Sequence, residues 1–448
     1  MSARFRSIVQ DPWIFSGLLF FVTVLLHSGS VKNGFSLDDY AAIVENPYVI
    51  SAEQDGQTRS VFSSNFWGDR KRFEHVTTWR PLTTLTFRMV HSLGGMQPWA
   101  FHTASLLLHG LVTSLVFWLA FRWFGRFAVG VVAGTIFAVM PVHVEVIAGA
   151  VNCAELQAAA LYLIATLLYL TGARADKNRR YWGLLGALVF FALALLSKEH
   201  AVTWPVALVI IEGTRHLRFR QRPNQEPWVR LPPVWFMAGV LLIIGVYLWS
   251  RSVVLPALLG GDIPVSDNPM VRASALERVM TIGKLYFRYL GLLVAPSVLT
   301  ADYTMPVIAV ATSIGEADVF GGLVLLGLTF ALVVVAIRRV PDVAGALLLF
   351  LMMASLVSNV FFLNTIVMAE RLMYLPSVAW CCFIGVVVAR VWDTARWSRV
   401  GRAALPLVMV LITLVYGWRS WERVPEWQNN WTLFQAAVRD EPASARSH

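Results

Sequence analysis

The 448-residue sequence has little cysteine and little charge. Its three cysteines, Cys153, Cys381 and Cys382, all lie in apolar segments, which excludes a disulfide framework and a spaced set of metal-binding thiolates. Only 14% of the residues are Asp, Glu, Lys or Arg, whereas 57% are hydrophobic. Soluble domains carry roughly 25% charged residues, so this composition excludes the soluble globular class and indicates a protein that crosses a membrane many times.

Apolar stretches recur along almost the whole chain, with the length of roughly 17 to 25 residues that an α-helix needs to cross a bilayer. The first covers Trp13–Ser30. We therefore predict an all-α polytopic membrane protein, a bundle of about eleven transmembrane helices with a structured first external loop.

One apolar segment is ambiguous. Val279–Val294 is apolar enough to cross the membrane but carries Lys284 and Arg288. A crossing there would also place Arg338 and Arg339 on the outer side, against the tendency of basic residues to stay inside. We therefore expect an in-plane or re-entrant helix.

The net charge of +10 is explained by its distribution across the membrane. If the N-terminus is cytoplasmic, 19 of the 37 basic residues but only six of the 27 acidic residues lie in inner segments. This is a positive-inside pattern, so binding to nucleic acid is not implied. Met1–Ser30 has the Arg-then-apolar pattern of a signal sequence without a convincing cleavage site, and we interpret it as an uncleaved signal anchor.

Two adjacent carboxylates follow the first apolar segment, in Ser36-Leu37-Asp38-Asp39-Tyr40. This position lies near the outer membrane surface, where hydration is partial and an ionisable group is costly. Asp38 and Asp39 are therefore candidates for the chemical centre. The alternative is a turn or helix cap with two solvated aspartates.

Further ionisable residues collect at the outer ends of the predicted spans. An unpaired charge there costs on the order of a few kcal/mol, so many of them together indicate a shared polar cavity. The alternative is that Lys198-Glu199 and Glu370-Arg371 are structural pairs at helix ends. The members of the set are Asp38, Asp39, Arg80, His143, Glu145, Lys198, Glu199, Arg251, Lys284, Arg288, Asp302, Tyr303, Glu370 and Arg371.

Such a cavity suits transfer of a sugar from a lipid-linked phosphate. An arginine can hold the departing phosphate through a bidentate fork, and a carboxylate can take the proton of an attacking hydroxyl. His143 is an alternative base, or a hydrogen-bonded structural partner beside Glu145. The Asp pair could hold a divalent cation, but no third ligand has a useful spacing, so no metal is assigned.

Several motifs that carry these residues occur in a fixed order: Leu37-Asp38-Asp39-Tyr40 with Asn46-Pro47, Trp79-Arg80-Pro81-Leu82, Phe101-His102 with His109, Pro141–Glu145 with Ala154-Glu155, Leu196–Glu199, Asp267–Pro269, Asp302-Tyr303 and Ala369–Ser377. The ordered set resembles that of the TMTC-type membrane O-mannosyltransferases and their bacterial relatives, in the GT-C glycosyltransferase superfamily. The resemblance covers most of the chain.

The resemblance implies a GT-C-like helical bundle, a polyprenyl-phosphate sugar donor, mannose as the first choice of sugar, and catalysis on the periplasmic or lumenal face. It implies Asp38 as the first choice of general base and Asp39 as the second. Arg80, Lys198 and Arg371 are the candidates for gripping the donor phosphate. The supporting residues are His102, His143, Glu145, Glu199, Asp302, Tyr303 and Glu370.

The sequence departs from the family pattern at three places. Met140 stands where the family usually has His before Pro, and Asn152-Cys153 replaces the usual Gly-Arg before Ala-Glu. Family members also usually continue into external tetratricopeptide repeats, whereas here one candidate helix, Trp427–Arg439, follows the last span. The chain is thus either a short or truncated form, or acceptor capture takes place in the membrane-facing cavity or through a partner.

We accordingly predict a transmembrane glycosyltransferase domain over 1–420, with 31–99 as its first external loop, and an external amphipathic helix over 421–448 that could begin a repeat. The expected location is the bacterial inner membrane with a periplasmic active site, or the endoplasmic reticulum membrane in a eukaryote. The expected partners are the lipid bilayer, the polyprenyl-phosphate sugar and an acceptor.

The leading hypothesis is an inverting glycosyltransferase whose acceptor is a protein hydroxyl or an envelope glycan. The alternative is a transporter or flippase of a lipid-linked envelope precursor, in which the cations bind phosphate and no base is needed. Transporters often contain internal repeats and mid-membrane charges. No repeat of fixed period is visible here and the charges gather at one surface, which favours the enzyme.

Overall fold

The computed structural model describes residues 11–50, 61–69, 78–172, 176–222, 231–255, 263–394 and 399–442. Within these ranges the regular secondary structure is entirely helical, which confirms the predicted all-α fold. Parts of the predicted external loop, 51–60 and 70–77, lie outside the described residues.

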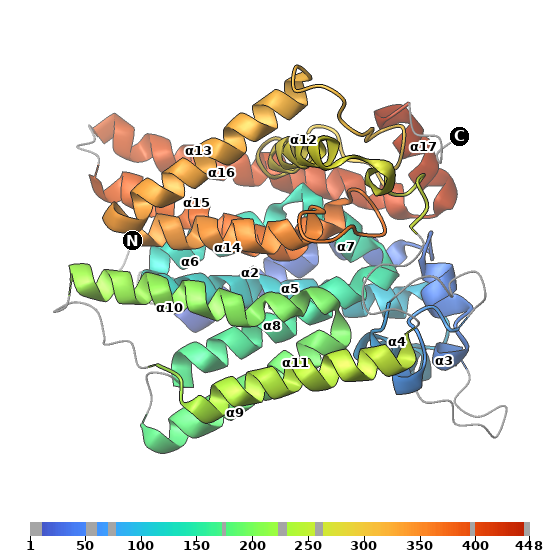
Figure 1. The fold of residues 1–448 in the computed structure, drawn as a ribbon, viewed down its shortest axis with the longest axis horizontal. Helices are drawn as coiled ribbons and strands as arrows, with labels where there is room; N and C mark the ends of the chain where they lie inside the picture. Colours follow the sequence, from blue (N-terminus) through green and yellow to red (C-terminus); the bar gives the residue numbers. More distant parts are fainter. Residues whose placement is uncertain are drawn as a thin grey trace.

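The longer helices form the bundle in Figure 1, where most of them run across the view. Their bounds are α2 Pro12–Leu26, α5 Pro98–Phe124, α6 Phe127–Val139, α8 Cys153–Gly172, α9 Lys177–Ser197, α10 Trp204–Gln221, α11 Val234–Val254, α13 Ala317–Arg339, α14 Pro341–Val357, α15 Tyr374–Thr394 and α16 Arg399–Arg423.

The remaining helices and single turns connect them and carry most of the predicted site. They are η1 Ser28–Lys32, η2 Tyr40–Val44, α3 Pro47–Ile50, η3 Val61–Ser63, α4 Pro81–Gly94, η5 Pro141–His143, α7 Val144–Ala148, η6 Ala150–Asn152, η7 Glu199–Thr203, η8 Pro269–Arg272, α12 Ala275–Val294, η9 Glu370–Met373, η10 Val424–Trp427 and α17 Asn430–Asp440.

Among the described residues, seven helices are long and apolar enough to cross a membrane. An eighth span results if α6 and the following helical turns, which meet at 57°, count as one broken segment. α2 and α14 are apolar but shorter, with 15 and 17 residues. The predicted number of about eleven crossings therefore stays a prediction.

The two ends of the bundle differ in character. α3, α4, α7 and α17 gather at one end, on the right in Figure 1. At the other end, where α10 finishes and α14 begins, Asp342 accepts hydrogen bonds from Arg218 at 3.0 Å and Arg390 at 3.2 Å. This basic end corresponds to the predicted inner side, so the short helices mark the predicted outer side.

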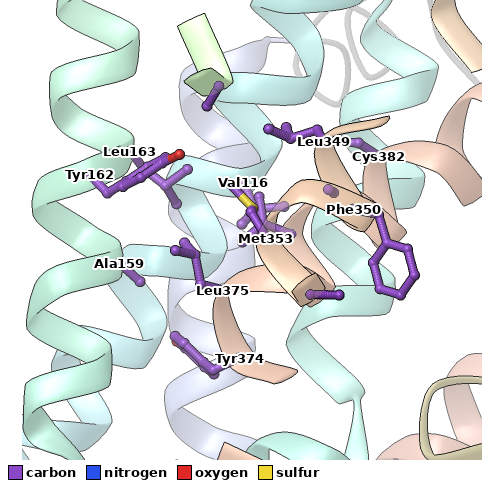
Figure 2. Packing of buried hydrophobic residues seen from close by; sticks show 14 of the residues in the cluster. Val116, Ala159, Tyr162, Leu163, Leu349, Phe350, Met353, Tyr374, Leu375 and Cys382 are labelled. Carbon is purple, nitrogen blue, oxygen red and sulfur yellow. The ribbon is translucent and has the colours of Figure 1, made fainter. Parts of the chain in front are cut away.

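The core lies where α5, α8, α14 and α15 meet (Figure 2). Figure 2 shows Val116, Leu163, Met353 and Leu375 from these four helices packed together. Cys382 belongs to the same cluster, and all three cysteines are buried and unpaired, as the packing interpretation expects. Helices in a bilayer associate mainly through such close packing, because lipid is as apolar as the side chains.

α12 differs in direction from its neighbours, since Figure 1 shows it nearly end-on while the bundle helices run across the view. It is also absent from the helices that are apolar enough to span. Lys284 on α12 donates to Glu316 at 2.6 Å, and Arg288 donates to Asp318 at 3.4 Å. This orientation supports the expected in-plane helix and explains how its two cations are accommodated.

α12 and α13 cross at two glycines, Gly283 and Gly322. A Cβ atom on Gly322 would lie 1.8 Å from the carbonyl oxygen of Gly283, so the helix backbones would have to separate. We expect Gly322→Ala to lower the free energy of unfolding by roughly 1–3 kcal/mol, seen as a lower unfolding temperature in detergent. Gly327→Ala is the matched control on α13, because its Cβ would face open space. Equal unfolding temperatures for the two variants would contradict the close crossing.

Candidate functional site

The two adjacent aspartates have opposite environments. Asp39 is fully buried, and its carboxylate accepts backbone N–H groups of Ser36 at 3.0 Å and Val151 at 2.7 Å. It therefore ties the loop after α2 to η6. Asp38 is exposed. The alternative of two solvated aspartates in a turn is wrong for Asp39.

Asp38 lies within electrostatic range of Arg371 in η9, the turn before α15. The backbone N–H of Arg371 donates to Glu145 Oε2 at 2.8 Å, and its guanidinium binds Glu145 Oε1. The Arg371 side chain keeps 23% of its surface exposed, while that of Glu145 is almost completely buried. Glu145 thus anchors an arginine that still reaches the solvent near Asp38.

Glu370 holds a second arginine, Arg423 at the end of α16. Arg423 Nη2 donates to both carboxylate oxygens of Glu370, at 2.8 and 3.0 Å, and the hydroxyl of Tyr303 donates to Oε1 at 3.0 Å. Burial raises the pKa of Tyr303 well above its ordinary value, so the phenol remains a donor. Asp302 accepts the N–H and hydroxyl of Thr304, at 3.0 and 2.7 Å, which shapes the turn around Tyr303.

A third set of charges surrounds η7. Arg80 binds Glu199 through two parallel hydrogen bonds, of 3.1 and 2.8 Å. Burial acts to raise the pKa of Glu199, but the charge and hydrogen bonds of Arg80, together with the charges of Arg251 and Lys198, hold that pKa well below its ordinary value. The carboxylate is therefore ionised at neutral pH, as a bidentate arginine pair requires.

Lys198 forms a buried ion pair with Glu155 on α8, and His200 Nδ1 lies 3.4 Å from the other oxygen of Glu155. Burial lowers the pKa of His200 to about 4, so the imidazole is neutral at pH 7. Arg251 adds a further positive charge near Glu199.

Lys198 and Glu199 are adjacent in the sequence, as are Glu370 and Arg371, but in neither case do the two adjacent residues form an ion pair with each other. Lys198 binds Glu155 while Glu199 binds Arg80, and Glu370 binds Arg423 while Arg371 binds Glu145. Each pair joins elements that are far apart in the chain. All three cations predicted to grip phosphate therefore already have a carboxylate partner.

A small pocket lies between these charge sets. Its polar wall comes from Glu155, His200 and Thr203, and its apolar wall from α14, α15 and the turn before α15. Arg371 is within electrostatic range of Glu155, and its neighbour Leu372 lines the pocket. The apolar wall consists of Met353, Leu356, Val357, Leu372, Leu375 and Pro376.

The predicted histidines lie behind this surface. His143 is buried, with Nδ1 3.0 Å from the carbonyl oxygen of Phe137 and Nε2 2.8 Å from Ser377 Oγ. This geometry supports a structural role for His143 rather than that of a base. His102 is also buried, with Nε2 3.1 Å from the carbonyl oxygen of Gly34.

Two parts of the arrangement escaped sequence reasoning. Arg423 is separated from Glu370 by 53 residues, and only its position at the end of the last apolar segment could have suggested an outer charge. Lys284 and Arg288 form separate pairs with Glu316 and Asp318, so the expected sharing of one cavity is wrong for them. Over the part of the chain that the structure describes, no three His, Cys, Asp or Glu side chains are grouped to hold a metal.

The arrangement can perform two chemical tasks. An exposed carboxylate beside an anchored, partly exposed arginine can take up a proton while the arginine neutralises an anion. The small pocket beside these groups has one polar and one apolar wall, and it has room for about one water molecule rather than for a whole lipid.

The fold is that of a GT-C-type polytopic membrane protein. A crystal structure of the oligosaccharyltransferase of Archaeoglobus fulgidus matches with a TM-score of 0.50 and 12% identity, over 96% of this chain and 57% of that one. At this identity the match supports the fold alone.

Sequence comparison shows which proteins this chain resembles. Residues 79–249 match the family model described as dolichyl-phosphate-mannose-protein mannosyltransferase. Human protein O-mannosyl-transferase TMTC3 is 27% identical over 450 residues, covering 95% of this chain and 47% of that protein. Tmtc2 of Drosophila melanogaster is 33% identical over 304 residues, covering 65% of this chain and 30% of that protein.

These matches confirm the predicted resemblance: the chain is a relative of the TMTC-type protein O-mannosyl-transferases. It spans about half the length of the curated relatives that match it over almost its whole length.

Burial gives Asp39 an unusual titration. It raises the pKa of Asp39 to about 7, although hydrogen bonds from the backbone of Ser36 and Val151 oppose it. In the unfolded chain the same group loses its proton near pH 4. Between these values the folded state binds more protons, so this group makes the fold less stable as pH rises from about 4 to 7.

We therefore expect this group alone to lower the free energy of unfolding by an amount on the order of 4 kcal/mol over this range. The lowered pKa of His200 acts in the opposite direction, so the contribution of Asp39 is measured as the difference between the wild type and Asp39→Asn. Asp39→Asn should be less stable than the wild type at pH 4, because its amide N–H₂ faces a backbone donor, and this difference should shrink as pH rises to 7. Asp38→Asn, at the exposed neighbour, should keep the wild-type slope. Parallel curves for Asp39→Asn and the wild type would contradict the prediction.

Proposed function

We propose that this protein is an inverting glycosyltransferase that moves a monosaccharide, with mannose as the first choice, from a polyprenyl-phosphate donor to a hydroxyl of a protein or envelope glycan. The observation that carries the proposal is the exposed carboxylate of Asp38 beside Arg371, next to a pocket with polar and apolar walls. The name of the matching family model and those of the relatives support mannose.

In the reaction, Asp38 accepts the proton of the acceptor hydroxyl as its oxygen attacks the anomeric carbon of the sugar. The bond from that carbon to the phosphate oxygen breaks, and its electron pair leaves with the phosphate. Arg371 neutralises the charge that develops there. Attack opposite to the leaving phosphate inverts the configuration at the anomeric carbon.

The two adjacent aspartates have different roles because their environments differ. Asp39 uses its oxygens to accept backbone N–H groups, so it holds the loop, and Asp38 is the base. Around η7, the cations Arg80, Lys198 and Arg251 all lie within electrostatic range of Glu199. Positive groups near η7 would help to hold an anionic head group beside Arg371.

Arg371 is the first choice for direct phosphate contact among the three predicted cations. Its side chain is more exposed than those of Arg80, at 14%, and Lys198, at 11%. Arg80 and Lys198 would have to share their donors with Glu199 and Glu155. We assign them to holding η7 and α8 in place through these ion pairs.

The site would face the periplasm or the lumen of the endoplasmic reticulum, because the short helices lie at the end opposite the basic end. The proposal includes no metal ion, and activity that survives EDTA would agree with this. A transporter of a lipid-linked precursor would need the cations but no base, so the Asp38–Arg371 geometry favours the transferase.

The test of the base is sugar transfer or release from radiolabelled polyprenyl-phosphate mannose by the purified protein in detergent. We expect Asp38→Asn to lower the rate by roughly 10²- to 10⁴-fold while donor binding stays within about threefold, because the amide cannot take the proton. Glu422→Gln is the control, since Glu422 is an exposed acid near the same end of the bundle. Saturable donor binding without release in the wild type would instead favour a transporter or another sugar.

The role of Arg371 is tested by Arg371→Gln, which keeps a polar side chain but cannot neutralise a phosphate. We expect kcat/KM for the donor to fall by roughly 10- to 100-fold, equivalent to about 1.4–2.8 kcal/mol. Arg288→Gln, which removes an arginine paired with Asp318 outside the site, should leave kcat/KM unchanged. Equal losses in the two variants would remove Arg371 from the mechanism.

A further inference from the structure

The C-terminal part of the chain lies directly on the loop that carries Asp38. Three hydrogen bonds join them across almost the whole sequence. The amide of Asn33 donates to the carbonyl oxygen of Val424 at 3.3 Å, the N–H of Gly34 donates to that of Gln428 at 2.8 Å, and the N–H of Leu37 donates to Asn430 Oδ1 at 2.8 Å.

The last of these bonds acts on an unusual residue. Leu37, immediately before Asp38, has a φ angle of +47°. Residues other than glycine and asparagine rarely adopt this left-handed region. Such a conformation costs roughly 1–3 kcal/mol and persists only where the surroundings enforce it. Asn430 holds the N–H of this residue, and the Leu37 side chain packs against the cluster that contains Trp427 and Leu433.

The α17 helix does not itself require the side chain of Asn430. The N-cap of α17 is Asn429, whose side chain accepts the N–H of Thr432 while Thr432 Oγ1 accepts the N–H of Asn429. The helix start is thus already complete. The side-chain oxygen of Asn430 instead accepts the N–H of Leu37, in the loop that carries the two aspartates.

The same segment also reaches the other side of the site. Arg423, one residue before η10, binds Glu370, which directly precedes Arg371. The two groups that the proposed reaction needs close together, Asp38 and Arg371, are therefore both supported by residues 423–430.

We propose that Asn430 is a positioning residue for Asp38. By fixing the left-handed turn at Leu37, it directs the Asp38 carboxylate toward Arg371 and makes the start of α17 part of the catalytic apparatus. This inference rests on the proposed function, in which Asp38 is the base.

The kinetic test compares Asn430→Ala with two matched variants in the transfer assay. Asn430→Ala should lower kcat by roughly 10-fold or more with little change in the KM for the donor, because the base is misplaced while the pocket is intact. Asn430→Asp retains an acceptor oxygen and should recover most of kcat. Trp431→Ala changes the next residue of α17, whose side chain is 72% exposed, and should behave as the wild type.

The second measurement does not depend on activity. Hydrogen exchange of a peptide covering residues 33–40 should be faster in Asn430→Ala than in the wild type and unchanged in Trp431→Ala. Unchanged exchange, or faster exchange with an unchanged kcat, would overturn the inference. If the wild type transfers no sugar, the proposed function fails, while the exchange experiment still decides whether Asn430 holds the loop.

Discussion

The structure depends on the pairing of charges at the outer edge of an apolar bundle. An ionisable side chain there is stable only when a partner or water compensates the loss of hydration, and removing one partner of a buried pair is far more costly than keeping both. Arg80, Glu145 and Glu370 each meet this condition through a residue distant in sequence. The pairs thereby fix how α7 and the end of α16 lie against η9, and how the start of α4 lies against η7.

This requirement also explains the contrast between the two aspartates. A carboxylate buried at Asp39 is tolerable because backbone N–H groups supply the hydrogen bonds that water would have given. Asp38, one residue away, is exposed to solvent. The buried carboxylate fixes the loop and the exposed one is left available for chemistry.

The sequence was sufficient for the features that depend on local composition and spacing. Long apolar segments predicted the helical bundle, the cations of Val279–Val294 predicted the unusual α12, and the position of the Asp pair predicted a loop at one end of the bundle. The pairing partners could not be predicted, because the choice between Glu199 and Glu155 for Lys198 depends on how helices pack. For the same reason, Arg423 and Asn430 escaped notice.

The contacts between the loop after α2 and residues 423–430 have a physical consequence for the site. The loop after α2 contains a left-handed turn at Leu37, a conformation that persists only where the surroundings enforce it. Residues 423–430 supply hydrogen bonds to this loop and anchor Glu370 through Arg423. The loop that carries Asp38 and the turn that carries Arg371 therefore both contact the same C-terminal segment, in addition to their anchors at Asp39 and Glu145.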